Sequence, residues 1–152
     1  MIIEYDKTTK EIMTVHPGKK YVASEWTSYN RTGYAIAKSD TDFQDTFNKY
    51  AIIDADGITF TLGDLTLFSI TQNKSYMSAN DTDYIEFTNV PEGTTIKIDG
   101  VSKGTMDASG VLRVKATEVG LYTATFEKLL YRTISMAFRA HDGYLYDNIT
   151  GE

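Results

Sequence analysis

Apolar and polar side chains alternate along two neighbouring stretches in the middle of the chain, 84–90 and 94–98. Alternation with a period of two is typical of β-strands that bury one face. A Pro-Glu-Gly turn at 91–93 separates the two stretches. Asp99-Gly100 follows the second stretch, and this dipeptide favours a tight hairpin turn. The pattern predicts two short antiparallel strands around a tight connection, followed by a hairpin into a third strand.

Similar short strands are expected along most of the chain. The stretches 2–5 and 12–15 flank a polar run and predict a hairpin. Strands spaced at about eight to twelve residues, with turn residues between them, indicate a small β-sandwich in the second half of the chain. The remaining strands are predicted at 21–23, 34–36, 58–62, 65–70, 111–114, 122–126 and 131–138.

One helix is expected in the first half of the chain. Ser39, Asp40 and Thr41 are residue types that cap helix N-termini. Apolar side chains then recur at helical spacing, at Phe43, Phe47, Tyr50 and Ala51. The spacing predicts a helix of two to three turns near 41–51, which needs packing against the rest of the chain to persist.

Composition shifts divide the sequence into three parts. The segment 71–82 is polar and lacks periodicity, so it is interpreted as a linker or a long surface loop. The predicted parts are an N-terminal β-rich attachment region with the helix at 1–72, a β-sandwich at 83–140 and a C-terminal arm at 141–152.

The second part resembles a known module. The run VPEGTTIKIDG at 90–100, followed by Gly104 and by GLYTATFE at 120–127, resembles the PEGA-type immunoglobulin-like module. That family places a Pro-Glu-Gly turn before a strand, an Asp-Gly turn after it and a Gly-x-Tyr strand later. The match covers roughly 83–131. It implies a fold that is mainly β, with the N-terminal β-rich region and its short helix joined to a C-terminal immunoglobulin-like β-sandwich.

The chain departs from this family pattern in three places. Thr94 stands where alanine is usual, the second turn is longer through 106–110, and Leu130-Tyr131 replaces the usual Gly-Tyr. The whole chain also resembles the small accessory structural proteins of tailed bacteriophages. Those proteins join a short β-rich attachment region to an immunoglobulin-like module, lack cysteine and a signal peptide, and are acidic. Neither resemblance implies a catalytic residue.

Charge and cysteine content narrow the function classes. The chain of 152 residues has a net charge of −6 and no cysteine. Scattered basic pairs such as Lys19-Lys20 do not form the clustered basic surface that binding to nucleic acid requires. Disulfides, thiolate metal sites and cysteine nucleophiles are excluded. The segment 1–7 lacks the features of a signal peptide and no apolar run could span a bilayer, so a soluble cytoplasmic product is expected.

The acidic clusters and histidines are interpreted as structural. Residues 54–57, Asp-Ala-Asp-Gly, resemble the opening of a calcium loop, but the turn chemistry of Asp-Gly is favoured. Asp81, Asp83 and Glu86 form a second acidic group, interpreted as solvated turn residues. The only histidines, His16 and His141, are each expected to end a strand rather than to bind zinc. No catalytic, cofactor-binding or metal-binding residue is predicted, so the chain is not expected to be an enzyme.

A candidate recognition surface is expected around the single tryptophan. Trp26 has Tyr21, Tyr29 and Tyr34 nearby in the sequence. Exposed aromatic rings of this kind could stack on sugar rings, whereas the favoured alternative is that Trp26 fills the core, as tryptophan usually does.

The sequence therefore predicts a non-enzymatic structural or accessory component of a bacteriophage particle, in its tail or capsid, located in the virion. Its partners would be other virion proteins, contacted by an oligomer or by many copies, with no cofactor, nucleic acid or membrane. The alternative is a carbohydrate-binding or adhesion module whose aromatic platform binds a surface glycan.

Overall fold

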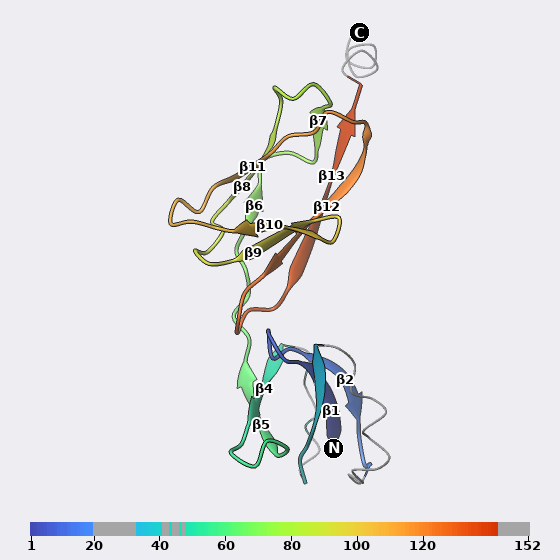
Figure 1. Ribbon diagram of the computed structural model, residues 1–152, viewed down its shortest axis with the longest axis vertical. Helices are drawn as coiled ribbons and strands as arrows, with labels where there is room; N and C mark the ends of the chain where they lie inside the picture. The colour runs from blue at the N-terminus through green and yellow to red at the C-terminus, as the bar shows by residue number, and fades with distance from the viewer. Residues whose placement is uncertain (20–32, 41–42, 44–45, 47, 143–152) are drawn as a thin grey trace. The chain divides into compact units, whose positions relative to one another are not determined.

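The chain forms two compact units built from β-strands. The computed structural model describes residues 1–19, 33–40, 43, 46 and 48–142 (Figure 1). The first unit comprises Met1–Leu67 and Leu129–Arg132, and the second comprises Phe68–Lys128 and Thr133–Glu152. Each unit has a hydrophobic core of its own.

Two small antiparallel sheets form the first unit. Strands β1 (Ile2–Asp6), β2 (Ile12–His16) and β3 (Tyr34–Lys38) pair in the order β2-β1-β3, and β4 (Lys49–Ile53) pairs with β5 (Phe60–Asp64). The hairpin predicted at 2–5 and 12–15 is thereby confirmed. The apolar side chains of both sheets share one core, in which the rings of Phe43 and Phe60 lie 5.9 Å apart.

The helix predicted near 41–51 is wrong. None of the described residues in this range is helical, and the last three of them begin β4. Ala51 is buried and its N–H donates to the carbonyl of Lys10 at 2.9 Å. Ile52 and Ile53 are β-branched and fit a pleated strand better than a helix. Pairing with β5 supplies the backbone hydrogen bonds that a short isolated helix could not retain, so the described fold is all-β.

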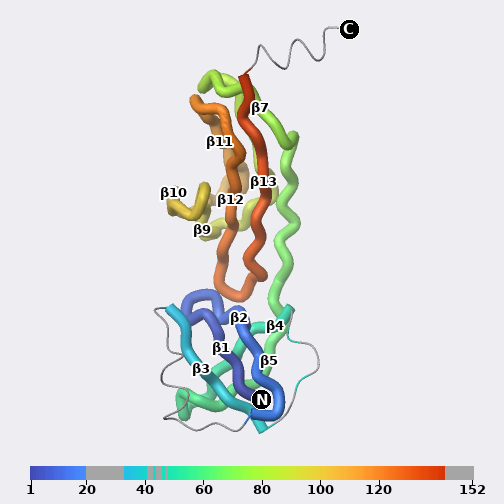
Figure 2. Tube along the Cα trace, turned by 90° about the vertical axis from the view of Figure 1, so that its right-hand side faces the viewer, coloured from blue at the N-terminus to red at the C-terminus, as the bar shows by residue number. Residues whose placement is uncertain are grey.

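The second unit is a two-sheet sandwich. Its larger sheet has five strands in the order β10-β9-β12-β13-β7, and its smaller sheet has three in the order β11-β8-β6. Figure 2 shows the long strands β12 and β13 running side by side in the larger sheet. The eight strands are β6 (Thr71–Gln72), β7 (Tyr76–Ser78), β8 (Ile85–Thr88), β9 (Thr95–Ile98), β10 (Val101–Thr105), β11 (Leu112–Val114), β12 (Gly120–Glu127) and β13 (Ile134–His141).

Aromatic rings from both sheets fill the core of this sandwich. The ring of Phe87 on β8 lies 5.3 Å from Phe126 and 6.1 Å from Phe138, edge to face in both cases. Met77 on β7 is fully buried in the same core. The polar segment 71–82 thus carries two strands and a core side chain, so its interpretation as a linker or loop is wrong.

The two strands predicted around the Pro-Glu-Gly turn exist, but they do not pair with each other. β8 pairs with β6 and β11 in the smaller sheet, and β9 pairs with β10 and β12 in the larger one. The turn therefore carries the chain from one sheet to the other. Thr94 is fully buried there, and its hydroxyl donates to the carbonyl of Pro91 at 2.6 Å. Val90 is buried as well, and its N–H donates to Gly110.

The hairpin predicted at Asp99-Gly100 is confirmed. It joins β9 to β10, with φ of 48° at Asp99 and 79° at Gly100, as a type I′ turn requires. The strand predicted at 65–70 is wrong, since only an isolated bridge at Thr66 falls within it. The prediction at 21–23 lies outside the described residues, as does the C-terminal arm after Asp142.

Candidate functional site

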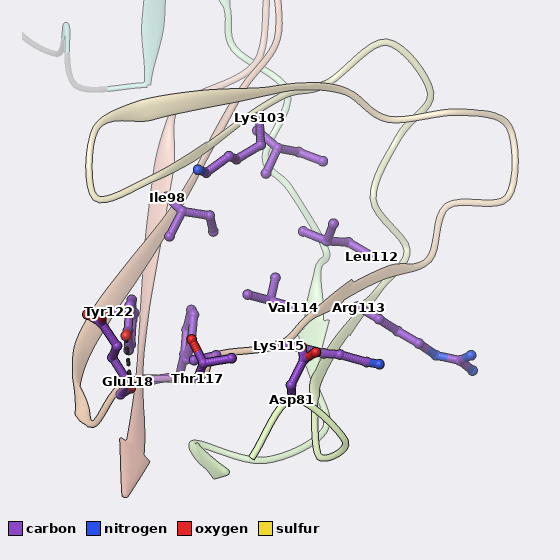
Figure 3. Close-up of a pocket in the computed structure, with 13 residues that line it drawn as sticks. Asp81, Ile98, Lys103, Leu112, Arg113, Val114, Lys115, Thr117, Glu118 and Tyr122 are labelled. Atoms are coloured by element: carbon purple, nitrogen blue, oxygen red, sulfur yellow. Dashed lines mark hydrogen bonds between the residues drawn. The ribbon is translucent and has the colours of Figure 1, made fainter. Parts of the chain in front are cut away.

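An open cavity lies between the two sheets of the second unit. The smaller sheet has three strands and the larger one five, so part of the larger sheet's inner face has no strand opposite it among the described residues. The cavity has a volume of about 540 Å³ and lies where the smaller sheet ends at β11. Figure 3 shows Ile98 and Lys103 on the side of the β9–β10 hairpin and Leu112 and Val114 on the opposite side.

The interior of the cavity is apolar because both sheets turn alternate side chains inward. Ile98 on β9 and Leu112 and Val114 on β11 are partly buried and pack against the core of the unit. The ring of Tyr122 stacks on Phe138, with 5.5 Å between centroids and 13° between planes. The Tyr122 hydroxyl donates to the carbonyl of Glu118 at 2.9 Å, which holds the ring at the cavity wall. The result is a preformed apolar surface that is still accessible from one side.

Charged groups lie at opposite ends of this cavity. Lys103 reaches over one end, and Asp81, Lys115 and Glu118 lie at the other (Figure 3). In the part of the chain that the structure describes, the side chains of these four residues form no ion pair and no hydrogen bond. One end thus carries a single positive charge, whereas the two carboxylates and one amine at the other end give it a net negative charge.

Arg113 on β11 also lines the cavity, but its charged group is held by other side chains. Its Nε donates to Glu86 at 2.8 Å, and its guanidinium lies 5.0 Å from the centroid of the Tyr84 ring. The hydrogen bond to Glu86 is the largest of several effects that raise the pKa of Arg113, and the negative charge of Glu86 adds to it. Figure 3 shows the Arg113 side chain pointing away from the hollow. This arrangement directs the neighbouring Leu112 and Val114 inward, as alternation along a strand requires.

The predicted aromatic platform is represented by one residue only. Trp26, Tyr21 and Tyr29 lie outside the described residues. Tyr34 begins β3 and is partly buried. The glycan-binding role of this group stays a prediction, and a glycan array with wild type and Trp26→Ala tests it.

The acidic residues at 54–57 form a turn, as the favoured interpretation held. The Asp56 carboxylate accepts hydrogen bonds from the N–H groups of Ile58 and Thr59 at 2.8 and 2.7 Å, and from the Thr59 hydroxyl. These bonds, led by the one from the hydroxyl, lower the pKa of Asp56. The carboxylate is therefore committed to its own turn rather than to a ligand.

Two members of the second acidic group, Asp83 and Glu86, have local partners. Asp83 pairs with Lys74 at 2.5 Å and accepts from the N–H of Ser78 at 3.0 Å. The hydrogen bond from Lys74 is the largest of several effects that lower the pKa of Asp83. Glu86 instead pairs with Arg113, as described above. His16 and His141 end strands β2 and β13, as predicted.

Two negative findings apply to the described residues alone. Within those ranges, no three His, Asp or Glu side chains are grouped so that they could hold a metal ion. The same part of the chain contains no helix with the length and apolar character needed to cross a membrane.

The cavity residues could not be recognised from the sequence pattern. The strand at 111–114 was predicted, but its position at the end of a sheet depends on which strands pair with it. The prediction paired the strands at 84–90 and 94–98 with each other, whereas the structure places them in different sheets. Lys103, Asp81 and Glu118 lie in separate segments of the sequence. Only the fold brings them to the same cavity as Ile98, so no sequence motif marks them as neighbours.

Comparison with known proteins adds little to this description. No family model matches the chain, and no curated protein matches it. Among solved structures, the chain is similar to the "D00-D0 domain of Intimin", with 14% sequence identity over 93% of this chain and 84% of that chain. The TM-score of this likeness is 0.36, which does not establish a shared fold.

Proposed function

We propose that this chain is a non-enzymatic structural module that acts by binding another protein through the open side of its second unit. The observation that carries the proposal is the accessible apolar cavity beside β11. Ile98, Leu112 and Val114 expose apolar surface there that a sandwich of two equal sheets would bury. A partner that covers this surface removes it from water, which stabilises the complex by roughly 25 cal/mol for each Å² of apolar area buried.

A protein partner fits this site better than a small molecule does. The cavity adjoins the last strand of a sheet, whose backbone can pair with another chain. A small ligand would fill the apolar interior and leave this edge unused. An extended protein segment can form backbone hydrogen bonds with this edge and also place apolar side chains in the interior. This is a recurring mode of protein recognition.

We further propose the role that the sequence predicts for this module, namely that of an accessory component in the tail or capsid of a bacteriophage particle. The second unit would be its immunoglobulin-like module, present in many copies so that weak contacts act together. Mass spectrometry of purified particles tests this part. If purified particles lack the chain, the phage role is wrong. The proposed binding of another protein would then take place outside a phage particle.

Cross-linking mass spectrometry on the full-length chain in its native source tests the binding role and identifies the partner. The purified partner is then titrated against wild type and two matched variants, Val114→Glu in the cavity and Leu121→Glu at an exposed position of β12. Leu121 is 65% exposed and does not line the cavity. We expect Val114→Glu to weaken binding at least tenfold and Leu121→Glu to leave it unchanged. The absence of any specific protein partner would contradict the proposed function.

A further inference from the structure

We infer that the partner contributes an extended segment, which pairs antiparallel with the free edge of β11 and places apolar side chains in the cavity between a basic and an acidic residue. This inference rests on the proposed function and names the form and chemistry of the partner. The free backbone edge, the missing strand and the two charged ends each contribute a separate argument.

The hydrogen bonds of β8 show that the outer edge of β11 is free at Arg113. On β8, the N–H of Glu86 donates to the Asn73 side chain at 2.8 Å, and its carbonyl accepts from the N–H of Asn73 at 2.9 Å. Both backbone groups of Glu86 therefore point away from β11. Glu86 is the register partner of Arg113, so these two residues form a non-hydrogen-bonded antiparallel pair.

The backbone N–H and C=O of Arg113 must then point to the outer edge of the sheet. Successive residues of a strand direct these groups to opposite sides, so β11 bonds to β8 through Leu112 and Val114. In the part of the chain that the structure describes, no further strand pairs with β11. Arg113 thus offers one donor and one acceptor in the geometry that an added strand uses.

An added strand would also cover the cavity. It would become the fourth strand of the smaller sheet, facing a part of the larger sheet that has no strand opposite it among the described residues. Its inward side chains would lie among Ile98, Leu112, Val114 and Tyr122, which line the cavity. Antiparallel pairing is expected because it is the more stable arrangement and the one that β11 makes with β8.

The β10 edge of the larger sheet is less suited to this role. All five residues of β10 are exposed, and its register with β9 shifts between Ser102 and Gly104. A bulge of this kind twists an edge strand and disfavours further pairing. The β10 edge is therefore protected, whereas β11 lies beside the apolar cavity.

The unpaired charges specify the ends of the segment. Along β11 the chain runs from Leu112, towards the Lys103 end, to Glu118 at the opposite end (Figure 3). An antiparallel segment would begin beside Asp81 and Glu118 and finish beside Lys103. The two carboxylates outnumber the Lys115 amine at the first of these ends. Charge complementarity then places a basic side chain at the start of the segment and an acidic one at its end, with apolar side chains between them.

Two synthetic peptides test this orientation on the full-length chain. The first is acetyl-Lys-Thr-Val-Thr-Val-Thr-Asp-amide, whose alternate residues place lysine, two valines and aspartate on one face. The second exchanges the terminal lysine and aspartate. In methyl- and amide-resolved NMR titrations at low salt, we expect the first peptide to bind about tenfold more tightly, because opposite charges attract and like charges repel. Shifts should concentrate at the methyl groups of Ile98, Leu112 and Val114, with slower amide exchange at Arg113.

A proline substitution separates strand addition from simple filling of the cavity. Arg113→Pro removes the N–H that faces the free edge and keeps the bonds between β11 and β8, as edge strands tolerate. Arg113→Ala removes the same side chain and keeps the N–H, so it is the matched control. We expect Arg113→Pro to bind the first peptide at least tenfold more weakly than Arg113→Ala. Unchanged methyl spectra of Ile85 and Met77 would show that both variants remain folded.

Several outcomes would overturn the inference. They are the failure of both peptides to bind, equal binding of the two peptides, and equal binding by the two Arg113 variants. Methyl shifts without slower exchange at Arg113 would indicate a cavity for small apolar ligands instead. If the identified protein partner binds Arg113→Pro as tightly as Arg113→Ala, strand addition is wrong while the proposed binding function stands.

Discussion

At the scale of single residues, several positions in this chain depend on one specific neighbour. Tyr50 on β4 and Gly63 on β5 are register partners, and the ring of Tyr50 lies over the glycine. A Cβ added at Gly63 would overlap the Cε1 and Cζ atoms of that ring. The glycine is therefore needed because an aromatic side chain from the adjacent strand occupies the space of its missing side chain.

Gly63→Ala is expected to destabilise the first unit by about 1–3 kcal/mol, because the added methyl group displaces the Tyr50 ring. Urea unfolding measured by circular dichroism checks the change. Gly120→Ala is the matched control, since an added Cβ there meets its nearest atom at an ordinary 3.6 Å. If Tyr50→Ala does not relieve the cost of Gly63→Ala in a double-mutant cycle, this steric explanation is wrong.

Asp83 links the stability of the second unit to pH. Its pKa is lowered from 3.8, first by the hydrogen bond from Lys74 and then by that from the N–H of Ser78. A depressed folded-state pKa contributes stability that is fully present above the unfolded value and lost as pH falls through the folded value. Thermal unfolding from pH 6 to pH 2.5 should show this loss, and Asp83→Asn should make the curve flatter. An identical pH dependence for wild type and Asp83→Asn would contradict the assignment.

At the scale of elements, the β9–β10 hairpin has the strongest local determinants in the second unit. Asp99 and Gly100 both adopt positive φ, which the turn requires. The Asp99 carboxylate also accepts a hydrogen bond from the N–H of Thr123 at 2.8 Å, which ties the turn to β12. The hairpin carries Lys103 and one side of the cavity, so its geometry matters for the proposed site.

Asp99→Ala is expected to destabilise the second unit by about 1–2 kcal/mol, since it removes that hydrogen bond and disfavours positive φ. Asp99→Asn should cost less, because asparagine tolerates positive φ and its side-chain oxygen can still accept. Chemical denaturation of the three proteins gives the comparison. Equal losses for alanine and asparagine would mean that neither property of Asp99 matters.

At the scale of the whole molecule, two separate cores imply two unfolding transitions. Phe60 is buried in the core of the first unit and Phe126 in that of the second. Because the cores share no buried side chain, a cavity made in one should not weaken the packing of the other.

Phe60→Ala and Phe126→Ala should each cost about 3–5 kcal/mol, and each should act on its own unit. Hydrogen exchange resolved along the sequence measures the loss of protection in both units at once. We expect Phe60→Ala to lower protection in β1 to β5 only, and Phe126→Ala to lower it in β6 to β13 only. A uniform loss of protection throughout the chain would show that the two units unfold together.

By itself, the sequence determined features that depend on neighbouring residues. Alternation placed the strands at 2–5, 34–36 and 94–98, and Asp99-Gly100 marked its hairpin because few dipeptides tolerate two positive φ angles. The apolar positions Tyr50 and Ala51 led to the wrong prediction of a helix, because an apolar pair of this kind fits either a helix or a strand. Pairing of β4 with β5 settled that choice.

Only the tertiary structure decided which strands pair and which edge stays free. From the sequence, the Pro-Glu-Gly turn is predicted to be a tight connection within one sheet. In the structure it connects the smaller sheet to the larger one, and Val90 and Thr94 on either side of it are buried. The cavity beside β11 follows from that crossing and from the unequal size of the two sheets. Its lining gathers Asp81, Lys103 and Glu118 from separate segments, and contacts between distant residues leave no periodic signal in a sequence.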